Sequence, residues 1–250
     1  MQVRALTDLS DLDVARRLFD VVWPAADGST QVPGNLMRAL VHAGGYVSVA
    51  FRDDVPIAAA LAFAGRHRDG SGWHDHLHSH MAAVLDPYRD QHIGTALKMH
   101  QRVWALDRGI DTIVWTFDPL VRRNARLNLI KLGVEVDGFE VNFYGSMDDG
   151  INSGDPTDRL FAWWRLDSPR AYAAAAGRLE PLDPTDLVIA GRDVLEIELP
   201  DDIVALRAAD PVAAAQWRVA LREALLAAFG DGFRIIGVSG AGGYVLERAP

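Results

Sequence analysis

Three residues at positions 91, 94 and 96 have the types and spacing of an anion-binding site. The stretch YRDQHIGTALK (88–98) places Gln91, Gly94 and Ala96 at the predicted start of a helix. The first turn of a helix has backbone N–H groups without intrahelical partners and the positive end of the helix dipole. Small residues there let a ligand approach the backbone closely, so we expect an anionic ligand. The stretch has neither the Gly-Lys-Ser/Thr of a nucleotide-hydrolysing P-loop nor the GxGxxG of a dinucleotide fold.

Four histidines occupy every second position of WHDHLHSH, at 74, 76, 78 and 80. In a strand they would project from one face, with neighbouring pairs ~6.6 Å apart. Imidazoles bind zinc, but this spacing would allow chelation only with distortion, so we expect no metal site. His74 and His76 are interpreted as solvated strand-end residues. A neutral imidazole can also act as a general base for an ammonium substrate near pH 7.

Composition and charge define the broad class of protein. The chain has 250 residues, of which 49% are hydrophobic and 24% charged, as in ordinary globular proteins. Its formal net charge of −9 argues against wide contact with nucleic acid or an anionic membrane. The sequence has no cysteine, which excludes disulfides, thiolate catalysis and Cys-ligated zinc. The N-terminus lacks a signal-peptide profile and no apolar run reaches membrane-spanning length, so we expect a cytoplasmic protein.

Hydrophobic periodicity and turn residues predict the elements that would position these side chains. For residues 1–166 the predicted order is β-α-α-β-β-β-α-β-α-β-β. The parts that bear on the candidate residues are strands at 46–51, 55–63 and 76–84, a Gly- and His-rich loop at 65–73, a helix up to Gly109, a strand at 112–117, a helix at 124–132, and strands at 134–144 and 159–166.

The last third of the chain has a different composition. An Ala- and Pro-rich linker at 167–186 precedes residues 187–250, for which the predicted order is β-α-α-β-β. This order repeats that of residues 3–63. The segment is interpreted either as a half-domain duplication or as an extension that covers a sheet edge.

The order of these elements resembles the GNAT superfamily of acyl-CoA-dependent N-acyltransferases over about residues 1–166. The resemblance rests on a strand, then Gln91-x-x-Gly94-x-Ala96 at a helix start, then a strand and a helix that ends in Lys131-Leu132-Gly133. It implies an α/β GNAT fold, with a mixed, splayed central sheet flanked by helices, here followed by the C-terminal β-α-α-β-β extension. LHSHM, WTFDPLVRRNARLNLIKLG and NFYGSMDDGINSGDPTDR resemble a narrower branch that is associated with N-acylamino-acid racemases.

The resemblance implies transfer of an acetyl or succinyl group from acetyl-CoA, or from another acyl-CoA, to the primary amine of a small molecule, including an amino acid. A homodimer is left open. The alternatives are a non-catalytic acyl-CoA-binding module and a protein-interaction scaffold. Two departures favour the first alternative. Gln91-His92-Ile93-Gly94 and Asp90 stand where many members have Arg-Gly-x-Gly and Gly, and Leu129 stands where many have the tyrosine that protonates the leaving thiolate.

The resemblance also implies which residues hold the cofactor. The pyrophosphate of coenzyme A would lie on the backbone of the loop Gln91, His92, Ile93, Gly94, Thr95 and Ala96. Pantetheine would bind the backbone of Ala82, Ala83 and Val84 in the gap to the strand 112–117, and an N–H near Val84 would stabilise the oxyanion. Asn124 is interpreted either as a helix cap or as a pantetheine ligand.

The expected catalytic and acceptor-side residues follow from the same comparison. His80 is the favoured general base and His78 the second choice, because both lie closest to the pantetheine strand. Tyr144 is interpreted either as the missing acid or as an edge aromatic. Asn142 and Arg159 are expected to bind the acceptor, with Arg159 either holding a carboxylate or pairing with Asp158. DDGIN (148–152) resembles a calcium-loop fragment but lacks the remaining ligands, so we expect no calcium site.

Overall fold

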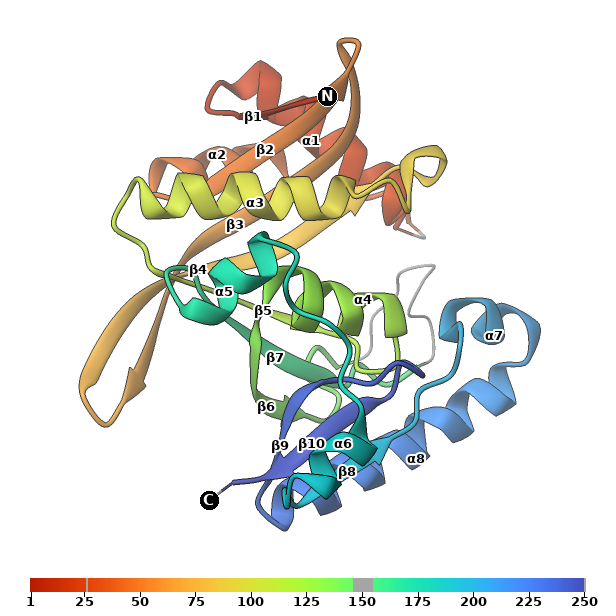
Figure 1. The fold of residues 1–250 in the computed structure, drawn as a ribbon. Coiled ribbons are helices and arrows are strands. Elements are labelled where there is room, and N and C mark those ends of the chain that lie inside the picture. Colours follow the sequence, from red (N-terminus) through yellow and green to blue (C-terminus); the bar gives the residue numbers. More distant parts are fainter. Residues whose placement is uncertain (26, 146–154, 250) are drawn as a thin grey trace. The chain divides into compact units, whose positions relative to one another are not determined.

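A computed structural model describes residues 1–25, 27–145 and 155–249 (Figure 1). They form two compact units, of which the first contains residues 1–115 and the second contains the described residues from 116 onward. Among the described residues, seven strands form a mixed sheet in the order β1-β2-β3-β4-β5-β7-β6, and three more form a sheet in the order β8-β10-β9. None of the described helices is long and apolar enough to cross a membrane.

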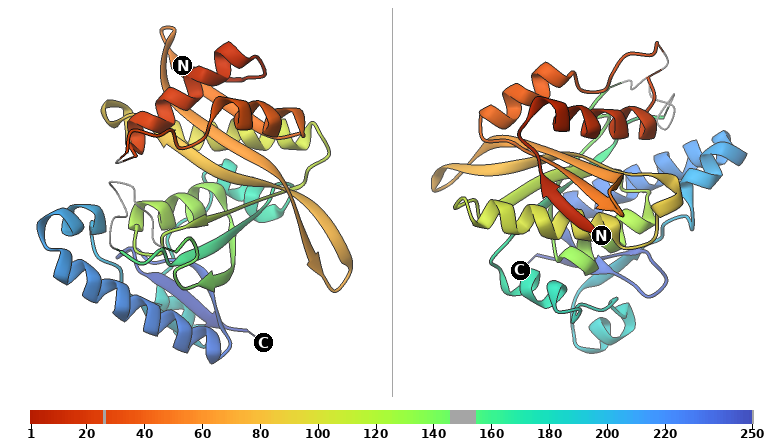
Figure 2. Two further views of the ribbon diagram at one scale, coloured as in Figure 1. Left: turned by 180° about the vertical axis from the view of Figure 1, so that it is seen from behind. Right: turned by 90° about the horizontal axis from the view of Figure 1, so that it is seen from above.

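The first unit is a sheet with helices on both faces. Its strands are β1 (Gln2–Ala5), β2 (Tyr46–Arg52), β3 (Val55–Asp69), β4 (Gly72–Val84) and β5 (Thr112–Phe117), whose last residues belong to the second unit. Helices α1 (Leu9–Val22) and α2 (Gly34–His42) cover one face, and α3 (Ile93–Leu106), which follows the short helix η1 (Asp86–Tyr88), covers the other (Figure 2). The core under α1 and α2 is apolar and includes Leu12, Ala15, Phe19, Met37, Val47, Val49, Ala59, Leu61 and Ala83.

The β3–β4 hairpin is longer than the sequence predicted. The expected loop at 65–73 is strand as far as Asp69 and again from Gly72, so the turn between them is tight. A side chain on Gly65 would meet the ring of His76 at 2.5 Å, so this glycine permits close cross-strand packing. His76 is buried as a result, and its interpretation as a solvated strand-end residue was wrong.

Strand β4 diverges from β5 within a few residues. β4 pairs with β3 along nearly its whole length, but with β5 only through Leu77 and His78. The partner of β3 changes from Ser79 to Met81 between two successive residues, so His80 is the extra residue of a β-bulge. Beyond His78, the edge of β4 has no β5 pairing in the described residues, which agrees with the predicted splay.

The second unit contains the end of β5 and all later described elements. These are α4 (Arg122–Arg126), the π-helical segment η2 (Leu127–Leu132), β6 (Glu135–Glu140), β7 (Arg159–Arg165), α5 (Pro169–Ala175), α6 (Pro184–Ile189), β8 (Val194–Ile197), α7 (Ile203–Ala209), α8 (Pro211–Gly230), β9 (Phe233–Val238) and β10 (Tyr244–Arg248). The last five confirm the predicted β-α-α-β-β order. The strand predicted to reach Tyr144 ends at Glu140, because Asn142 adopts a left-handed φ of 53° in the turn that follows.

Candidate active site

The predicted anion-binding loop leads directly into α3. Because the helix begins at Ile93, the N–H groups of Ile93, Gly94 and Thr95 have no intrahelical partner. A side chain built on Gly94 would meet no atom within 4 Å in this structure. Packing of the protein therefore does not require glycine at this position, whereas a ligand that approaches the backbone would.

Two residues of the loop are held in an unfavourable backbone conformation. Asp90 has a φ of 59° and His92, the N-cap of α3, a φ of 61°. Glycine adopts this left-handed region freely, but a residue with a side chain costs about 1–2 kcal/mol there. The loop thus keeps a conformation suited to glycine at two positions that lack it. Strain of this kind is concentrated at ligand-binding and catalytic sites.

The structure also brings a cation to this loop that sequence reasoning missed. Arg52, at the end of β2, donates from Nη1 to Oε1 of Gln91 at 2.9 Å, and its guanidinium lies 5.3 Å from the centre of the Tyr88 ring. Gln91 in turn donates from Nε2 to the carbonyl oxygen of Pro87 at 3.0 Å. Gln91 therefore holds a guanidinium beside the loop. Because Arg52 is 39 residues away in sequence, no local motif indicates it.

The free edge of β4 carries the backbone groups predicted to bind pantetheine. The N–H of Leu85 donates to the carbonyl oxygen of Ile57 in β3 at 3.0 Å. Since successive N–H groups of a strand point in opposite directions, the N–H groups of Val84 and Ala82 point away from β3. Ala83 is buried, but Ala82 is exposed. The unpaired edge thus presents the backbone of Ala82 and Val84.

His78 and His80 lie together on one face of the sheet. Their rings are 5.0 and 5.6 Å from that of Phe63, measured between ring centres. Burial, together with the nearby cationic groups, lowers the pKa of His78 to about 4. His80 is exposed, but desolvation by its neighbours also lowers its pKa. Both imidazoles are neutral at pH 7, but a base with a pKa of about 4 is weak, so His80 is the better candidate.

The remaining histidines form a separate group near the turn of the hairpin. Nδ1 of His67 lies 3.3 Å from Nδ1 of His76, and Nε2 of His74 lies 3.1 Å from a carboxylate oxygen of Asp69. Within the described part of the chain, no three His, Cys, Asp or Glu side chains are arranged to hold a metal ion.

Arg159, the first residue of β7 in the second unit, is a buried cation. Its exposed fraction is 8%, and burial lowers its pKa. Nη1 donates to the main-chain oxygen of Asp158 at 2.9 Å, and the guanidinium carbon is 5.3 Å from the centre of the Tyr144 ring. The alternative prediction, an ion pair with the Asp158 carboxylate, was wrong, because Arg222 binds that carboxylate at 2.9 Å.

A short turn fixes Tyr144 next to Arg159. The N–H of Tyr144 donates to Oγ1 of Thr157 at 2.9 Å, and the N–H of Asn142 donates to Oδ1 of Asp158 at 3.0 Å. Oδ1 of Asn142 accepts from the N–H of Thr157 at 3.2 Å, so this oxygen serves the turn itself. Tyr144 is 38% exposed, and its hydroxyl lies 2.9 Å from that of Thr116.

A buried ion-pair network connects α7 and α8 with the residue that follows β5. Asp118 accepts two hydrogen bonds from Arg218, at 2.8 and 2.9 Å, and one from Arg207 at 2.6 Å. Asp155 lies 2.8 Å from both arginines. Burial alone would raise the pKa of Asp118, but the two guanidinium groups hold it at about 2. The C-terminal extension is therefore part of the charged cluster that also contains Arg159.

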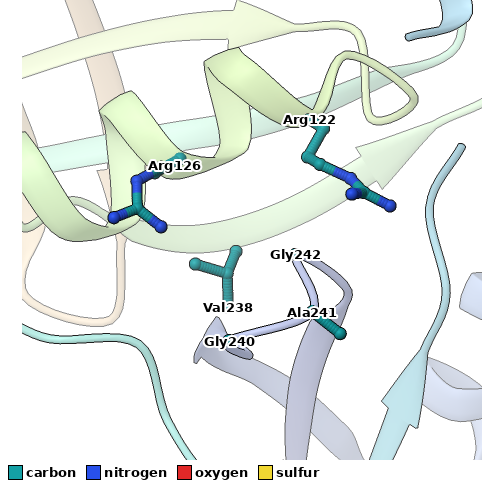
Figure 3. Close-up of a pocket in the computed structure, with 6 residues that line it drawn as sticks. All are labelled: Arg122, Arg126, Val238, Gly240, Ala241 and Gly242. Carbon is teal, nitrogen blue, oxygen red and sulfur yellow. The ribbon is translucent and has the colours of Figure 1, made fainter. Parts of the chain in front are cut away.

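Helix α4 carries the last predicted cofactor residue. The N-cap is Val121 and Asn124 lies inside the helix, so the interpretation of Asn124 as a cap was wrong. A pocket of about 230 Å³ lies beside α4, lined by Arg122, Arg126, Val238, Gly240, Ala241 and Gly242 (Figure 3). None of these lining residues is among the predicted site residues. The DDGIN stretch (148–152) lies outside the described residues.

Comparison with known proteins finds one family model that matches part of the chain. Residues 12–133 match the sequence model of the Acetyltransferase (GNAT) family. Among curated proteins, none has significant sequence similarity to this chain. Salmonella typhimurium yncA, solved with its cofactor acetyl-CoA, is 19% identical with a TM-score of 0.51, over 67% of this chain and 95% of that one. The ribosomal-protein-S18-alanine N-acetyltransferase of Escherichia coli is 15% identical with a TM-score of 0.50, over 67% and 94%.

At these identities, the solved structures establish the fold alone. The family match adds the activity, and it spans the loop before α3, the diverging strands β4 and β5, and both candidate histidines. Residues 12–133, just under half of the chain, therefore match the GNAT acetyltransferase family, and this match supports acyl-CoA-dependent N-acetyltransferase activity.

Proposed function

We propose that this protein transfers an acetyl or succinyl group from coenzyme A to the primary amine of a small molecule that bears a carboxylate, such as an amino acid. The observation that carries the proposal is Arg159. It is a buried guanidinium, and in the described residues no carboxylate lies within ion-pairing distance of it. A buried cation of this kind is costly unless an anion joins it.

The charges around Arg159 support an anionic ligand. The cluster contains three aspartates and four arginines, namely Asp118, Asp155, Asp158, Arg159, Arg207, Arg218 and Arg222. The aspartates pair with Arg207, Arg218 and Arg222. Among the described residues of the cluster, the positive charge of Arg159 is therefore not balanced by an aspartate. In a chain with a formal net charge of −9, such a local excess would offset the general repulsion of a carboxylate. A guanidinium would also orient that carboxylate through two parallel hydrogen bonds.

An amino acid is favoured among carboxylates because it places the carboxylate beside the amine that reacts. The likeness of LHSHM and of the 115–133 stretch to the branch associated with N-acylamino-acid racemases supports the same acceptor class. A succinyl donor would instead bring its carboxylate at the far end of the acyl chain. Tyr144, whose ring lies over Arg159, would form a wall of this subsite.

The acyl donor would bind to the first unit, at the loop before α3. The N–H groups of Ile93, Gly94 and Thr95 would bind the diphosphate of coenzyme A, with Arg52 as the neighbouring cation. The edge of β4 would bind pantetheine as an added strand, and the N–H of Val84 would stabilise the oxyanion. His80 would take the proton of the attacking amine.

The experiment that tests the proposal is release of free thiol from acetyl-CoA and succinyl-CoA, with a panel of amino acids and their uncharged amides. We expect turnover with carboxylate-bearing amines. Arg159→Ala should raise KM for these substrates much more than for an amide or another uncharged amine. Arg159→Lys should also impair the enzyme, because lysine keeps the positive charge but cannot donate two parallel hydrogen bonds to a carboxylate. Equal effects on charged and uncharged acceptors would show that Arg159 has a structural role.

A further inference from the structure

Lys98 in α3 is a lysine in the protein interior. Its exposed fraction is 8%, whereas Lys131, the only other lysine of the sequence, is exposed. Lysine is almost never buried unless an acidic partner compensates its charge. In the described part of the chain, no carboxylate lies within ion-pairing distance of Nζ. Methionine would fill a similar volume without the cost of a buried charge, so stability alone does not account for the lysine.

The neighbours of Lys98 place it where β4 and β5 separate. Nζ donates to Oγ of Ser79 at 2.7 Å and lies 3.7 Å from the centre of the Trp115 ring. Ser79 is the first residue of β4 beyond its pairing with β5, and Trp115 is the first residue of β5 beyond it. The ammonium group therefore lies at the vertex of the two diverging strands.

A buried polar group without a partner in the described part of the chain lies at the same point. Oε1 of Gln101 is 3.5 Å from Nζ of Lys98, and Nε2 of Gln101 is buried with no hydrogen-bond partner in the described structure. A buried donor without a partner costs about 1–3 kcal/mol. Lys98, Ser79 and Gln101 thus form a buried polar cluster in which one donor, the side-chain amide of Gln101, has no partner among the described residues.

The chemistry of an acyl-CoA thioester requires a proton donor, and the Lys98 ammonium group could serve as one. When the amine attacks, the C–S bond breaks and the sulfur leaves as a thiolate, which must gain a proton. Many members of the GNAT superfamily, which this chain resembles, use a tyrosine for this step. That position is Leu129 here, with an exposed fraction of 1%. Burial lowers the pKa of the Lys98 ammonium to about 7. An alkyl thiol such as cysteine has a pKa of about 8.5, so proton transfer from Lys98 to the thiolate is downhill.

We propose that Lys98, acting through the hydroxyl of Ser79, supplies the proton that the departing thiolate of coenzyme A takes up. This inference rests on the proposed course of pantetheine along β4. The C–N bond of the amide forms as the C–S bond breaks, and His80 or a water takes the proton of the amine. The Ser79 O–H gives its proton to sulfur while an N–H of Lys98 restores the hydroxyl. Lys98 is reprotonated from solvent once the products leave. The base and the proton donor are thus on opposite faces of the same strand.

The first test is Lys98→Met, with Lys131→Met as the matched control. Lys98→Met should lower kcat by at least about 10²-fold at pH 7, leave the Kd of coenzyme A within a few-fold of wild type, and unfold at the same or a higher temperature. Loss of activity with unchanged or higher stability distinguishes a functional lysine from a structural one. The wild-type rate should fall above about pH 7, as Lys98 loses its proton. This basic limb should be absent from Lys98→Met and present in Lys131→Met.

The second test changes the leaving group. An aryl thioester releases a thiolate that needs no proton, so it should react with Lys98→Met and Ser79→Ala nearly as fast as with wild type. Acetyl-CoA should remain slow with both variants. Equal losses with both donors, or a wild-type rate and pH profile in Lys98→Met, would overturn the proposal. A separate measurement tests the proposed coenzyme A site. If that site were wrong, calorimetry would show that Gly94→Glu binds coenzyme A as tightly as the wild type does.

Discussion

Replacement of Gly94 by alanine should stabilise the free protein and weaken coenzyme A binding at the same time. Gly94 lies in the first turn of α3, has no positive φ, and a methyl group there would meet no atom within 4 Å. Alanine is preferred to glycine in a helix by about 0.5–1 kcal/mol. For a chain of this size, that corresponds to an increase in Tm of about 1–4 °C.

The loss of affinity follows from the same methyl group. It would occupy the space through which a diphosphate must approach the N–H groups of the first turn. Loss of one charge-assisted hydrogen bond costs about 1.5–3 kcal/mol, so the Kd of coenzyme A should rise roughly 10–100-fold. Gly94→Glu adds a like charge in the same space and should abolish binding.

Thermal unfolding and calorimetric titration with coenzyme A measure the two effects separately. Gly34→Ala is the matched control, since Gly34 also begins a helix, has no positive φ, and a methyl group on it would likewise meet no atom within 4 Å. It should gain stability and bind coenzyme A as wild type does. If Gly94→Ala gained stability and also kept wild-type affinity, the diphosphate would not lie on this turn, and the reasoning would be refuted.

The remaining predictions concern the base and the ion-pair network. His80→Ala should lower kcat by about 10²–10⁴-fold with little change in coenzyme A affinity. Because desolvation lowers the pKa of His80 below its usual 6.5, the acid limb of the wild-type rate should lie below pH 6.5, and the variant should lack this limb in thiol-release assays. Arg218→Met should lower the free energy of unfolding in urea by about 3–5 kcal/mol at pH 7. The pKa of Asp118 is about 2 in the folded chain against 3.8 ordinarily, so the wild type should lose this contribution only below about pH 4. Equal unfolding curves for the two proteins at pH 7 would contradict the network.

The features that follow from local patterns were predictable. The order of the elements and the start of α3 depend on hydrophobic periodicity and on turn residues, which the sequence shows directly. The splay of β4 was expected only from the resemblance to the GNAT superfamily. The prediction of a loop at 65–73 was wrong because glycine can also allow close packing between strands, as Gly65 does against His76. A cytoplasmic location, a homodimer and the domain boundary after residue 166 stay predictions.

The parts of the site that were missed depend on contacts distant in sequence. Arg52 reaches Gln91 across 39 residues, and Arg218 reaches Asp118 across 100. The sequence did contain a local indication of the buried Lys98. Lys98, Gln101 and Ala105 recur at helical spacing, and all three are buried. A charged residue within a buried stripe of a helix is itself an indication of function.

The network around Asp118 also bears on how the chain is made. Its arginine partners, Arg207 and Arg218, follow 89 and 100 residues later, so at ~5–20 residues per second a ribosome delivers them roughly 4–20 s after the carboxylate. Until then, burial of Asp118 would leave its negative charge without a partner, so the carboxylate is more stable in water. We expect the first 115 residues to be able to fold during synthesis, while the second unit completes its folding only after α8 has left the ribosome.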